Sequence, residues 1–357
     1  MGPTQSSSKK ALSTVLICGI PLTPEHRARL EPFFSTIYHY GDYNEAPKDA
    51  ELADADVIYG FPPASLVSTS QVPKLQFIQL ASAGSERVLG RPFWKEEESK
   101  NIKLATAAGV HTGPIPQYFI GTTLALYHKF QEQILISQNE KRWGSSDKIG
   151  AGRMFIQELR GKTIGILGYG HIGRESARLA AAFGANIIAA NTSGTKKAQD
   201  GYIIPGTGDP DGSIPSAYYS TADSASLASF LSKSDVILLS LPSTPATYHI
   251  LSSETIPHIK HSAIVVNIGR GDAIDTDALL EALDSGKLAG AALDVTEPEP
   301  LPDGHPLFGR MNVIITPHLS GRTERYFDLS LDIFIENAER WKEGKLPLNL
   351  VDLQRGY

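Results

Sequence analysis

Short apolar runs alternate with segments of helical spacing along most of the chain. This alternation predicts parallel β-sheets covered by helices, an α/β fold. In the first third, the expected strands are Val15–Cys18, Ile37–Tyr40, Val57–Tyr59, Phe77–Leu80 and Lys103–Ala105, with helices near Pro24–Phe33 and Pro47–Ala53. A second series of strands is expected at Thr163–Leu167, Asn186–Ala190, Val236–Leu239, Ala263–Asn267, Gly290–Leu293 and Val313–Thr316. The 357 residues therefore favour two α/β domains, at roughly 150 residues per domain.

Two long helical patterns lie at the ends of the second series. A helix is expected from about Pro116 to Gln138, and another over Thr323–Lys342. The second has one apolar face, formed by Phe327, Leu331, Phe334, Ile335 and Ala338. If that face packs on the first unit, the first unit is discontinuous in sequence. Between these helices, Asn191–Ala222 holds five Gly and three Pro, so we expect a long irregular loop, either a surface insertion or a cover for the cofactor.

Composition narrows the class of protein. Hydrophobic residues make up 41% and charged residues 20%, and a single Cys excludes a disulfide scaffold or a cysteine-rich zinc site. With a net charge of −6 and no apolar run near the ~20 residues that span a bilayer, we expect no nucleic-acid, membrane or metal partner. Cys18 is expected to be a buried thiol in a reducing compartment, the cytoplasm. The Ser/Lys-rich Met1–Lys10 is expected to be a disordered tail, and Gln354–Tyr357 matches no targeting signal.

The clearest local signal is a glycine motif. The expected strand Thr163–Leu167 runs directly into G-x-G-x-x-G, formed by Gly168, Gly170 and Gly173, and a helical pattern follows. In this context the first glycine permits a tight turn, the second lets the backbone approach a pyrophosphate, and the third lets helix and strand pack closely. Free N–H groups and the helix dipole then hold the phosphate charge. The motif predicts a dinucleotide site rather than a glycine-rich turn without a ligand.

Three charged residues follow at or beyond later strands, where open α/β sheets bind ligands. Arg270 stands between two glycines, and a guanidinium there could hold a planar carboxylate through two parallel hydrogen bonds. His318 follows a strand and a proline, and an imidazole can donate and accept protons near neutral pH. Glu299 could fix the tautomer of that ring. Singly, Arg270 and His318 are better explained as a solvated arginine and a structural histidine, and Glu299 can be a capping or solvated acid. Together they predict one catalytic set beside a nicotinamide.

These residues resemble the D-isomer-specific 2-hydroxyacid dehydrogenase family, with its glyoxylate and hydroxypyruvate reductases. The glycine motif, Asn267–Gly271, Leu293–Val295 with Glu299–Pro302, and Pro317–His318 occur in the family's order and spacing. The match extends from about Leu75 to Trp341 and is strongest from Leu159 to Gly321, whereas the first 70 residues match only in their α/β pattern.

The resemblance implies two domains with an active site in the cleft. A Rossmann-type doubly wound parallel sheet would form the cofactor domain over residues 113–319, and a smaller flavodoxin-like α/β substrate domain would comprise residues 1–112 and 320–357. Arg270 would bind the substrate carboxylate, His318 would be the acid/base, and Glu299 would orient it. The implied substrate-binding residues are Ser82, Ala83, Gly84, Arg270 and His318. The implied and motif-derived cofactor-binding residues are Gly168, Tyr169, Gly170, His171, Ile172, Gly173, Leu241, Pro242, Thr247, Ile268, Gly269, Arg270, Asp294, His318 and Ser320. A homodimer through the cofactor domain is also implied.

The end of the strand Asn186–Ala190 bears on the choice between NADP and NAD. An NAD site normally has Asp or Glu about 20 residues beyond the glycine motif, where the acid binds the ribose hydroxyls and repels a 2′-phosphate. Here Asn191 stands in that place, and hydroxyl and amine donors follow it at Thr192, Ser193 and Lys196. We therefore expect NADPH to be preferred and NAD to be possible, unless this is a basic surface turn that never reaches the ribose.

The function that this reading favours is reduction of a 2-oxo acid to a D-2-hydroxy acid. The alternative is a dinucleotide-sensing, co-repressor-like binding protein on the same fold, because fold alone does not decide function. A formate-oxidising relative is disfavoured. Formate enzymes that resemble this family have Gln at the position of the histidine's carboxylate partner, and this chain has Glu299 there. Phe61 and Tyr326 could line the substrate pocket, which favours an apolar or aromatic side chain over glyoxylate.

Overall fold

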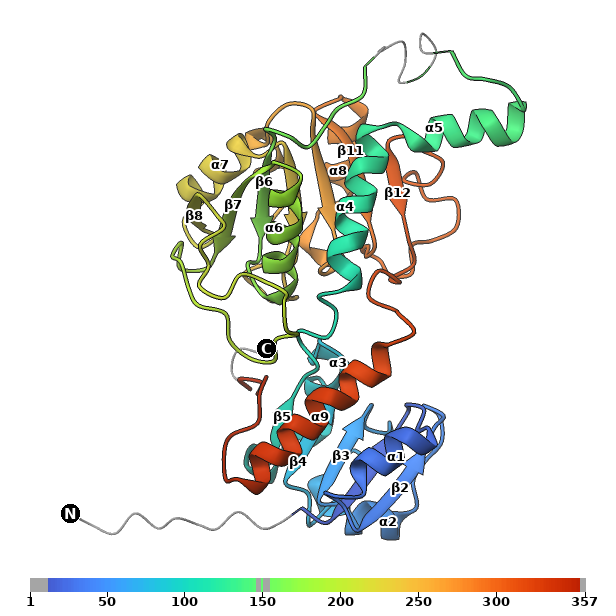
Figure 1. Cartoon of the computed structure of the whole chain (residues 1–357), viewed down its shortest axis with the longest axis vertical. Helices are drawn as coiled ribbons and strands as arrows, with labels where there is room; N and C mark the ends of the chain where they lie inside the picture. Colours follow the sequence, from blue (N-terminus) through green and yellow to red (C-terminus); the bar gives the residue numbers. More distant parts are fainter. Residues whose placement is uncertain (1–11, 146–148, 150–154, 354–357) are drawn as a thin grey trace, which may run out of the picture. The chain divides into compact units, whose positions relative to one another are not determined.

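The computed structural model describes residues 12–145, 149 and 155–353, which form two α/β units (Figure 1). Unit 1 comprises Met1–Val110 and Thr323–Tyr357, and unit 2 comprises His111–Arg322. These boundaries differ by two or three residues from those expected. The tail Met1–Lys10 and the end Gln354–Tyr357 lie outside the described residues.

Unit 1 is built on a sheet of five parallel strands. They are β1 (Thr14–Cys18), β2 (Thr36–Tyr40), β3 (Val57–Gly60), β4 (Phe77–Leu80) and β5 (Lys103–Ala105). Their spatial order is β2-β1-β3-β4-β5, which is the flavodoxin-like order. The predicted class of this domain is confirmed.

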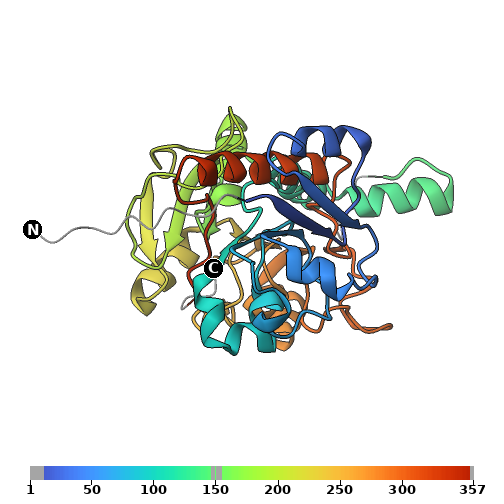
Figure 2. The same cartoon turned by 90° about the horizontal axis from the view of Figure 1, so that it is seen from below.

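Helices cover both faces of the unit 1 sheet. On one face, α1 (Pro24–Leu30) and the C-terminal α9 (Tyr326–Lys342) lie side by side (Figure 2). A hydrogen bond of 2.7 Å between His26 and Asp328 and an ion pair of 2.6 Å between Arg29 and Asp332 join the two helices. On the other face lie α2 (Asp49–Asp54) and α3 (Glu86–Leu89). Cys18 in β1 is buried as predicted, which raises the pKa of its thiol to about 12.

Unit 2 is built on a sheet of seven parallel strands. They are β6 (Thr163–Leu167), β7 (Asn186–Asn191), β8 (Ala217–Ser220), β9 (Val236–Leu239), β10 (Ala263–Asn267), β11 (Leu288–Leu293) and β12 (Val313–Ile315). The order β8-β7-β6-β9-β10-β11-β12 is that of a doubly wound Rossmann sheet with one added strand, which confirms the predicted class. The order in which successive strands join the sheet reverses between β6 and β9, so ligands are expected at the carboxyl ends of those two strands.

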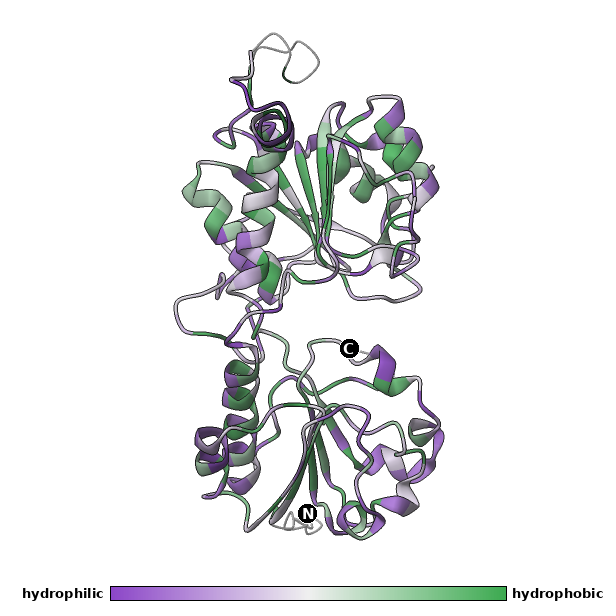
Figure 3. Ribbon diagram, turned by 90° about the vertical axis from the view of Figure 1, so that its right-hand side faces the viewer, coloured by the Kyte–Doolittle hydropathy of each residue, from purple (hydrophilic) through white to green (hydrophobic). Residues whose placement is uncertain are grey.

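Alternate residues of the unit 2 strands pack against helices on the two opposite faces of the sheet. Ile164 and Ile166 pack under α4 (Pro114–Tyr127) and α6 (His171–Ala182), whereas Ile237 and Leu239 pack under α7 (Ser224–Lys233) and α8 (Thr276–Asp284). The strands are accordingly coloured as hydrophobic over most of their length, whereas the helices mix hydrophobic and hydrophilic residues (Figure 3). Short 3₁₀ turns occur at Thr69–Gln71, Pro92–Lys95, Glu97–Asn101, Ile256–His258 and Gly271–Ala273.

Two expectations about the connections were wrong. The helix expected over Pro116–Gln138 ends at Tyr127, because Lys129 is left-handed with φ 58°, and the chain continues in a new direction as α5 (Phe130–Leu135) and a π turn, Ile136–Glu140. Both pieces are helical, so the residue spacing gives no sign of the break. The segment expected to be irregular over Asn191–Ala222 ends in strand β8, whose pairing with β7 is a tertiary interaction. No helix in the described part of the chain is long and apolar enough to cross a membrane.

Candidate active site

The glycine motif forms the tight turn between β6 and α6. Gly168 has φ +94°, and a Cβ there would lie 2.4 Å from the carbonyl oxygen of Ser240. A Cβ at Gly173 would lie 2.4 Å from the Gly168 carbonyl oxygen. At Gly170, by contrast, a Cβ would meet no described atom within 4 Å. The first and third glycines are therefore required by packing, and the second leaves open space above the backbone, as the phosphate-binding role demands.

The N-terminus of α6 has the donors that a pyrophosphate needs. Gly170 is the N-cap and contributes no side-chain cap, so the first N–H groups of the helix, at His171, Ile172 and Gly173, have no partner from a capping side chain. The first turn also carries no acid. Together with the helix dipole, these groups fit the diphosphate of a dinucleotide, for which the open space over Gly170 provides room.

The loop after β9 packs against this turn. An added Cβ at Gly269 would lie 2.7 Å from the Leu241 carbonyl oxygen, so the loops that carry Leu241 and Gly269 are in close contact. Thr247 shapes the loop, because its hydroxyl donates to the Pro242 carbonyl oxygen at 2.7 Å and accepts from Thr244 N–H at 2.9 Å. Ile268 is buried in the core beneath. The sequence-predicted residues of β9 and β10 thus meet at the point where the strand order reverses.

The Arg270 loop at the end of β10 is held by a buried asparagine. Asn267 donates from Nδ2 to the Arg270 carbonyl oxygen at 2.9 Å and accepts at Oδ1 from Gly269 N–H at 3.1 Å. Gly271 permits close approach of the next loop, because a Cβ there would lie 2.0 Å from the Thr296 carbonyl oxygen. The half-buried Arg270 side chain donates from Nη1 to the Gly269 carbonyl oxygen at 2.8 Å.

His318 and Glu299 form the hydrogen-bonded pair that the sequence suggested. Nδ1 of His318 lies 2.8 Å from Oε1 of Glu299, and their side chains are 51% and 36% exposed. His318 has φ +54°, and its N–H donates to the carbonyl oxygen of Asp294 at 2.9 Å. Because Nδ1 faces the carboxylate, Nε2 of the half-exposed ring is the nitrogen that can exchange a proton with a ligand.

Asp294 holds the segment that carries His318. This carboxylate is 2% exposed, and it accepts from the Thr316 hydroxyl at 2.6 Å and from the N–H groups of Leu319 and Ser320 at 3.0 Å. The Ser320 hydroxyl donates to it as well. Asp294 and Ser320 were predicted from family likeness to lie near the nicotinamide amide, and the geometry adds that they set the backbone on both sides of His318.

A second histidine–carboxylate pair escaped the sequence analysis. His249 Nε2 lies 3.1 Å from Glu297 Oε2, and the Tyr248 ring stacks on His249 at 3.9 Å between centroids. The pair joins the loop after β9 to the segment just before Glu299. No spacing links residues 48 positions apart, so only the fold could reveal it.

The turn after β7 uses its own polar side chains. Asn191 donates from Nδ2 to the Thr195 carbonyl oxygen at 2.8 Å and accepts from Gly194 N–H at 2.8 Å. The Ser193 hydroxyl donates to Asn191 Oδ1 at 3.1 Å. Lys196 pairs with Asp211 at 3.7 Å, and Thr192 is exposed. Of these predicted donors, Asn191 and Ser193 are thus engaged in shaping the turn.

In unit 1, the loop after β4 offers free donors. Ala81 accepts from the Tyr326 hydroxyl at 2.8 Å, and Ser82 donates its hydroxyl to the Gly84 carbonyl oxygen at 2.8 Å. The N–H groups of Ser82, Ala83 and Gly84 donate to no residue in the described ranges. Adjacent free N–H groups suit a carboxylate. No group of three or more His, Cys, Asp or Glu side chains that could hold a metal occurs in the same ranges.

Comparisons with known proteins identify the same family. A model of the "D-isomer specific 2-hydroxyacid dehydrogenase, NAD binding domain" matches residues 120–320. A glyoxylate reductase of Thermofilum pendens is 30% identical over 283 residues, which are 78% of this chain and 76% of that protein. A hydroxypyruvate reductase of Blautia hydrogenotrophica is 29% identical over 304 residues, 85% of this chain and 87% of that protein.

Solved structures agree on the fold. The crystal structure of an NADPH-dependent glyoxylate/hydroxypyruvate reductase from Sinorhizobium meliloti, in complex with NADP and sulfate, has a TM-score of 0.75 at 24% identity. The likeness covers 97% of this chain and 100% of that one. The chain therefore belongs to the D-isomer specific 2-hydroxyacid dehydrogenase family, and its second unit is the part that matches the NAD-binding domain.

Proposed function

We propose that this NAD(P)-dependent 2-hydroxyacid dehydrogenase reduces a 2-oxo acid to the D-2-hydroxy acid, with His318, Glu299 and Arg270 as its catalytic residues. The observation that carries the proposal is the 2.8 Å pair between His318 Nδ1 and Glu299 Oε1, on the same sheet edge as the glycine motif and Arg270. A dinucleotide-sensing protein without activity is less well supported, because the related proteins named above are reductases.

Each residue has a separate task in this proposal. The reduced nicotinamide supplies the hydride when it is bound. Arg270 holds the substrate carboxylate through its planar guanidinium and polarises the carbonyl that is reduced. His318 donates a proton from Nε2 to the new hydroxyl, while Glu299 on Nδ1 keeps the ring oriented and stabilises its charged form.

The loop Ser82–Gly84 is proposed to bind the substrate carboxylate through its three free N–H groups. Two aromatic residues lie beside it in unit 1. Tyr326 donates to Ala81, at the start of this loop, and Phe61 follows the neighbouring strand β3 and packs edge-on against Tyr43. These rings favour an apolar or aromatic substrate side chain.

NADPH is the proposed cofactor of choice. The acid that would repel a 2′-phosphate is replaced by Asn191 at the end of β7. The Sinorhizobium meliloti enzyme of the same fold is NADPH-dependent and was crystallised with NADP.

A homodimer through unit 2 is also proposed. Helix α5 projects from the rest of unit 2 (Figure 1), and over residues 130–145 the side chains of Phe130, Ile134 and Trp143 are 45%, 50% and 96% exposed. Apolar side chains exposed together are typical of protein–protein contacts. Light scattering should give twice the chain mass, and a monomer at micromolar concentration would contradict the dimer.

The cytoplasm is the proposed compartment, because the single Cys18 is free and buried and no oxidising environment is needed. Recovery of the native protein in a membrane or secreted fraction would contradict this placement.

The test of the reaction is spectrophotometric. The purified protein should oxidise NADPH in the presence of glyoxylate, hydroxypyruvate or phenylpyruvate, and His318→Ala should lose about 10²–10⁴-fold in kcat. His261→Ala is the matched control, because the ring of this exposed histidine of unit 2 bonds, within the described residues, only to the Ser262 hydroxyl. Equal turnover by His318→Ala and wild type would show that the catalytic assignment is wrong.

A further inference from the structure

Residues 197–210, which follow β7, form a strap that is hydrogen-bonded to α6. Arg174, on the first turns of α6, donates from Nη2 to the Lys197 carbonyl oxygen at 2.8 Å and from Nη1 to the Asp209 carbonyl oxygen at 2.6 Å. The two ends of the strap also bond to each other, because the Gln199 N–H donates to the Pro210 carbonyl oxygen at 2.8 Å. Arg174 is 5% exposed, so its guanidinium is committed to this contact. The strap therefore has a defined place beside the glycine motif.

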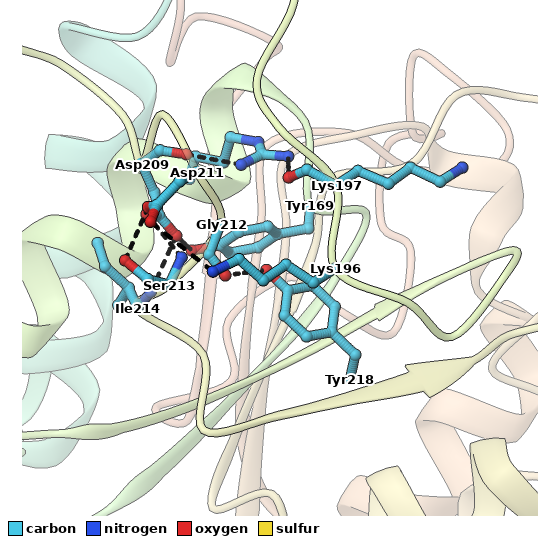
Figure 4. Close-up of polar contacts among 10 residues, drawn as sticks. Tyr169, Lys196, Lys197, Asp209, Asp211, Gly212, Ser213, Ile214 and Tyr218 are labelled. Atoms are coloured by element: carbon cyan, nitrogen blue, oxygen red, sulfur yellow. Dashed lines mark hydrogen bonds and ion pairs between the residues drawn. The ribbon is translucent and has the colours of Figure 1, made fainter.

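The side chain of Asp209 gives the strap a second set of hydrogen bonds (Figure 4). Its carboxylate is 3% exposed and accepts from the Tyr169 hydroxyl at 2.7 Å, from Ile214 N–H at 3.1 Å and from Ser213 N–H at 3.0 Å. Tyr169 is the second residue of the glycine motif, and burial raises its pKa, so the hydroxyl remains a donor. A buried carboxylate that is satisfied in this way makes the strap part of the domain rather than a loose insertion.

The strap walls a cavity of about 240 Å³ over the start of α6. Its lining includes the side chains of His171, Arg174, Asn191, Lys197, Gln199 and Asp200. Two of these side chains have a buried nitrogen without a hydrogen-bond partner among the described residues, Nε2 of His171 and Nε2 of Gln199. The other atom of the Gln199 amide, Oε1, already accepts from Asp209 N–H at 3.2 Å. The Gln199 amide nitrogen is an unsatisfied buried donor, and Nε2 of His171 becomes one when its ring is protonated, so both fit a ligand with acceptor oxygens.

Charge favours an anion in this cavity. Arg174 and Lys197 contribute two positive charges against the single carboxylate of Asp200. Lys197 forms no ion pair within the described residues, and its side chain extends away from the Asp209 cluster, whereas the neighbouring Lys196 pairs with Asp211 at 3.7 Å (Figure 4). Asn191, at the end of β7, marks the ribose end of a bound dinucleotide, so the anion expected here is a phosphate on that ribose.

We propose that Lys197, His171 and Gln199 bind the 2′-phosphate of NADPH, and that Asp209, through Tyr169 and Arg174, positions the strap that carries Lys197 and Gln199. The inference rests on the proposed function, in particular on the NADPH preference. The proposal assigns the main phosphate contacts to Lys197 and Gln199 and not to the turn after β7. In that turn the Ser193 hydroxyl donates to Asn191 Oδ1.

The first experiment measures binding without turnover. Titration calorimetry with 2′,5′-ADP and with 5′-AMP isolates the 2′-phosphate from the rest of the cofactor. Wild type should bind 2′,5′-ADP at least about tenfold more tightly, and Lys197→Ala should remove most of that difference while leaving the Kd for 5′-AMP within about twofold. Lys233→Ala is the matched control, because this lysine of unit 2 bonds to the Tyr219 hydroxyl, outside the cavity.

The outcomes separate two failures. If wild type binds both nucleotides equally, the NADPH preference itself is wrong. If wild type prefers 2′,5′-ADP but Lys197→Ala keeps the preference, or Lys196→Ala abolishes it instead, then only the present assignment is wrong. If Asp200→Asn weakens 5′-AMP at least tenfold, Asp200 binds the ribose hydroxyls and the cavity serves NADH, which also overturns the assignment.

Tyr169→Phe tests the positioning role. It removes the hydroxyl that donates to Asp209 but keeps the ring that packs edge-on against Tyr218. We expect the Kd for 2′,5′-ADP to rise several-fold with the melting temperature within a few degrees of wild type and the Kd for 5′-AMP unchanged. Equal weakening of both nucleotides, or no weakening of either, would contradict the positioning role of Asp209.

Discussion

Alanine at the second and third glycines of the motif should separate dinucleotide binding from folding. A Cβ at Gly173 would lie 2.4 Å from the Gly168 carbonyl oxygen and 3.0 Å from Cγ2 of Ile166, so backbone would have to move. A Cβ at Gly170 meets no atom within 4 Å in the described part of the chain, and its φ of −86° is open to alanine. Gly173→Ala should therefore damage the fold, and Gly170→Ala should only fill the space assigned to the pyrophosphate.

The magnitudes follow from these contacts. Overpacking of this kind costs about 1–3 kcal/mol, which lowers the melting temperature of a domain the size of unit 2 by roughly 2–12 °C. Gly170→Ala should stay within about 0.5 kcal/mol, or roughly 2 °C, as expected of a substitution without a clash. A methyl group against the pyrophosphate should nonetheless raise the Kd for NADPH at least about tenfold, which is about 1.4 kcal/mol.

The assay combines scanning fluorimetry of the free protein with calorimetric titration of NADPH. Gly121→Ala is the control, since a Cβ at this exposed glycine of α4 also has no described neighbour within 4 Å and alanine favours a helix. If Gly170→Ala lowers the melting temperature as much as Gly173→Ala, the space over Gly170 is needed for folding. If it binds NADPH as wild type does, the pyrophosphate does not lie there.

Three further predictions concern substrate and cofactor. Arg270→Lys should lower kcat/KM more than tenfold with the Kd for NADPH nearly unchanged, because an ammonium cannot make two parallel hydrogen bonds. Arg310→Lys, at the ion pair with Asp284, is the control. Activity of Arg270→Lys within threefold of wild type would refute the role of Arg270. The kcat/KM for phenylpyruvate should exceed that for glyoxylate, and the reverse order would exclude an apolar pocket. Burial lowers the pKa of His171, with Asp200 and Arg174 as its charged neighbours, so the free ring is neutral at pH 7. A bound dianion favours the protonated ring, so NADPH but not NADH should bind more tightly as the pH falls from 8 to 6, and His171→Asn should abolish that difference.

Much of the fold was predictable because its signals are local. A buried parallel strand is a short apolar run between turn residues, and all of the expected strands are present within one or two residues of their predicted ends. The glycine motif is equally local, since it depends on the backbone conformation at Gly168 and on the close approach at Gly173. The residue types at Arg270, Glu299 and His318 suggested the proposed chemistry, and the fold brings Glu299 and His318 into contact.

The features that the sequence alone did not reveal are those that join distant segments. The left-handed Lys129 interrupts a pattern that is helical on both sides, and β8 exists because it pairs with β7. Similarly, His249 and Glu297 are brought together by two loops, and nothing in their spacing marks them as a pair.

Tertiary structure was decisive for the cofactor pocket. The sequence placed the candidate phosphate donors directly after β7, where the acid of an NAD site would stand. Folding engages Asn191 and Ser193 in their own turn and brings Lys197 and Gln199 to the cavity, because Asp209 reaches back 40 residues to Tyr169. Residue types and local spacing thus predicted a dinucleotide site, whereas the long-range hydrogen bonds of one buried carboxylate decide which side chains line the cavity proposed for its ribose.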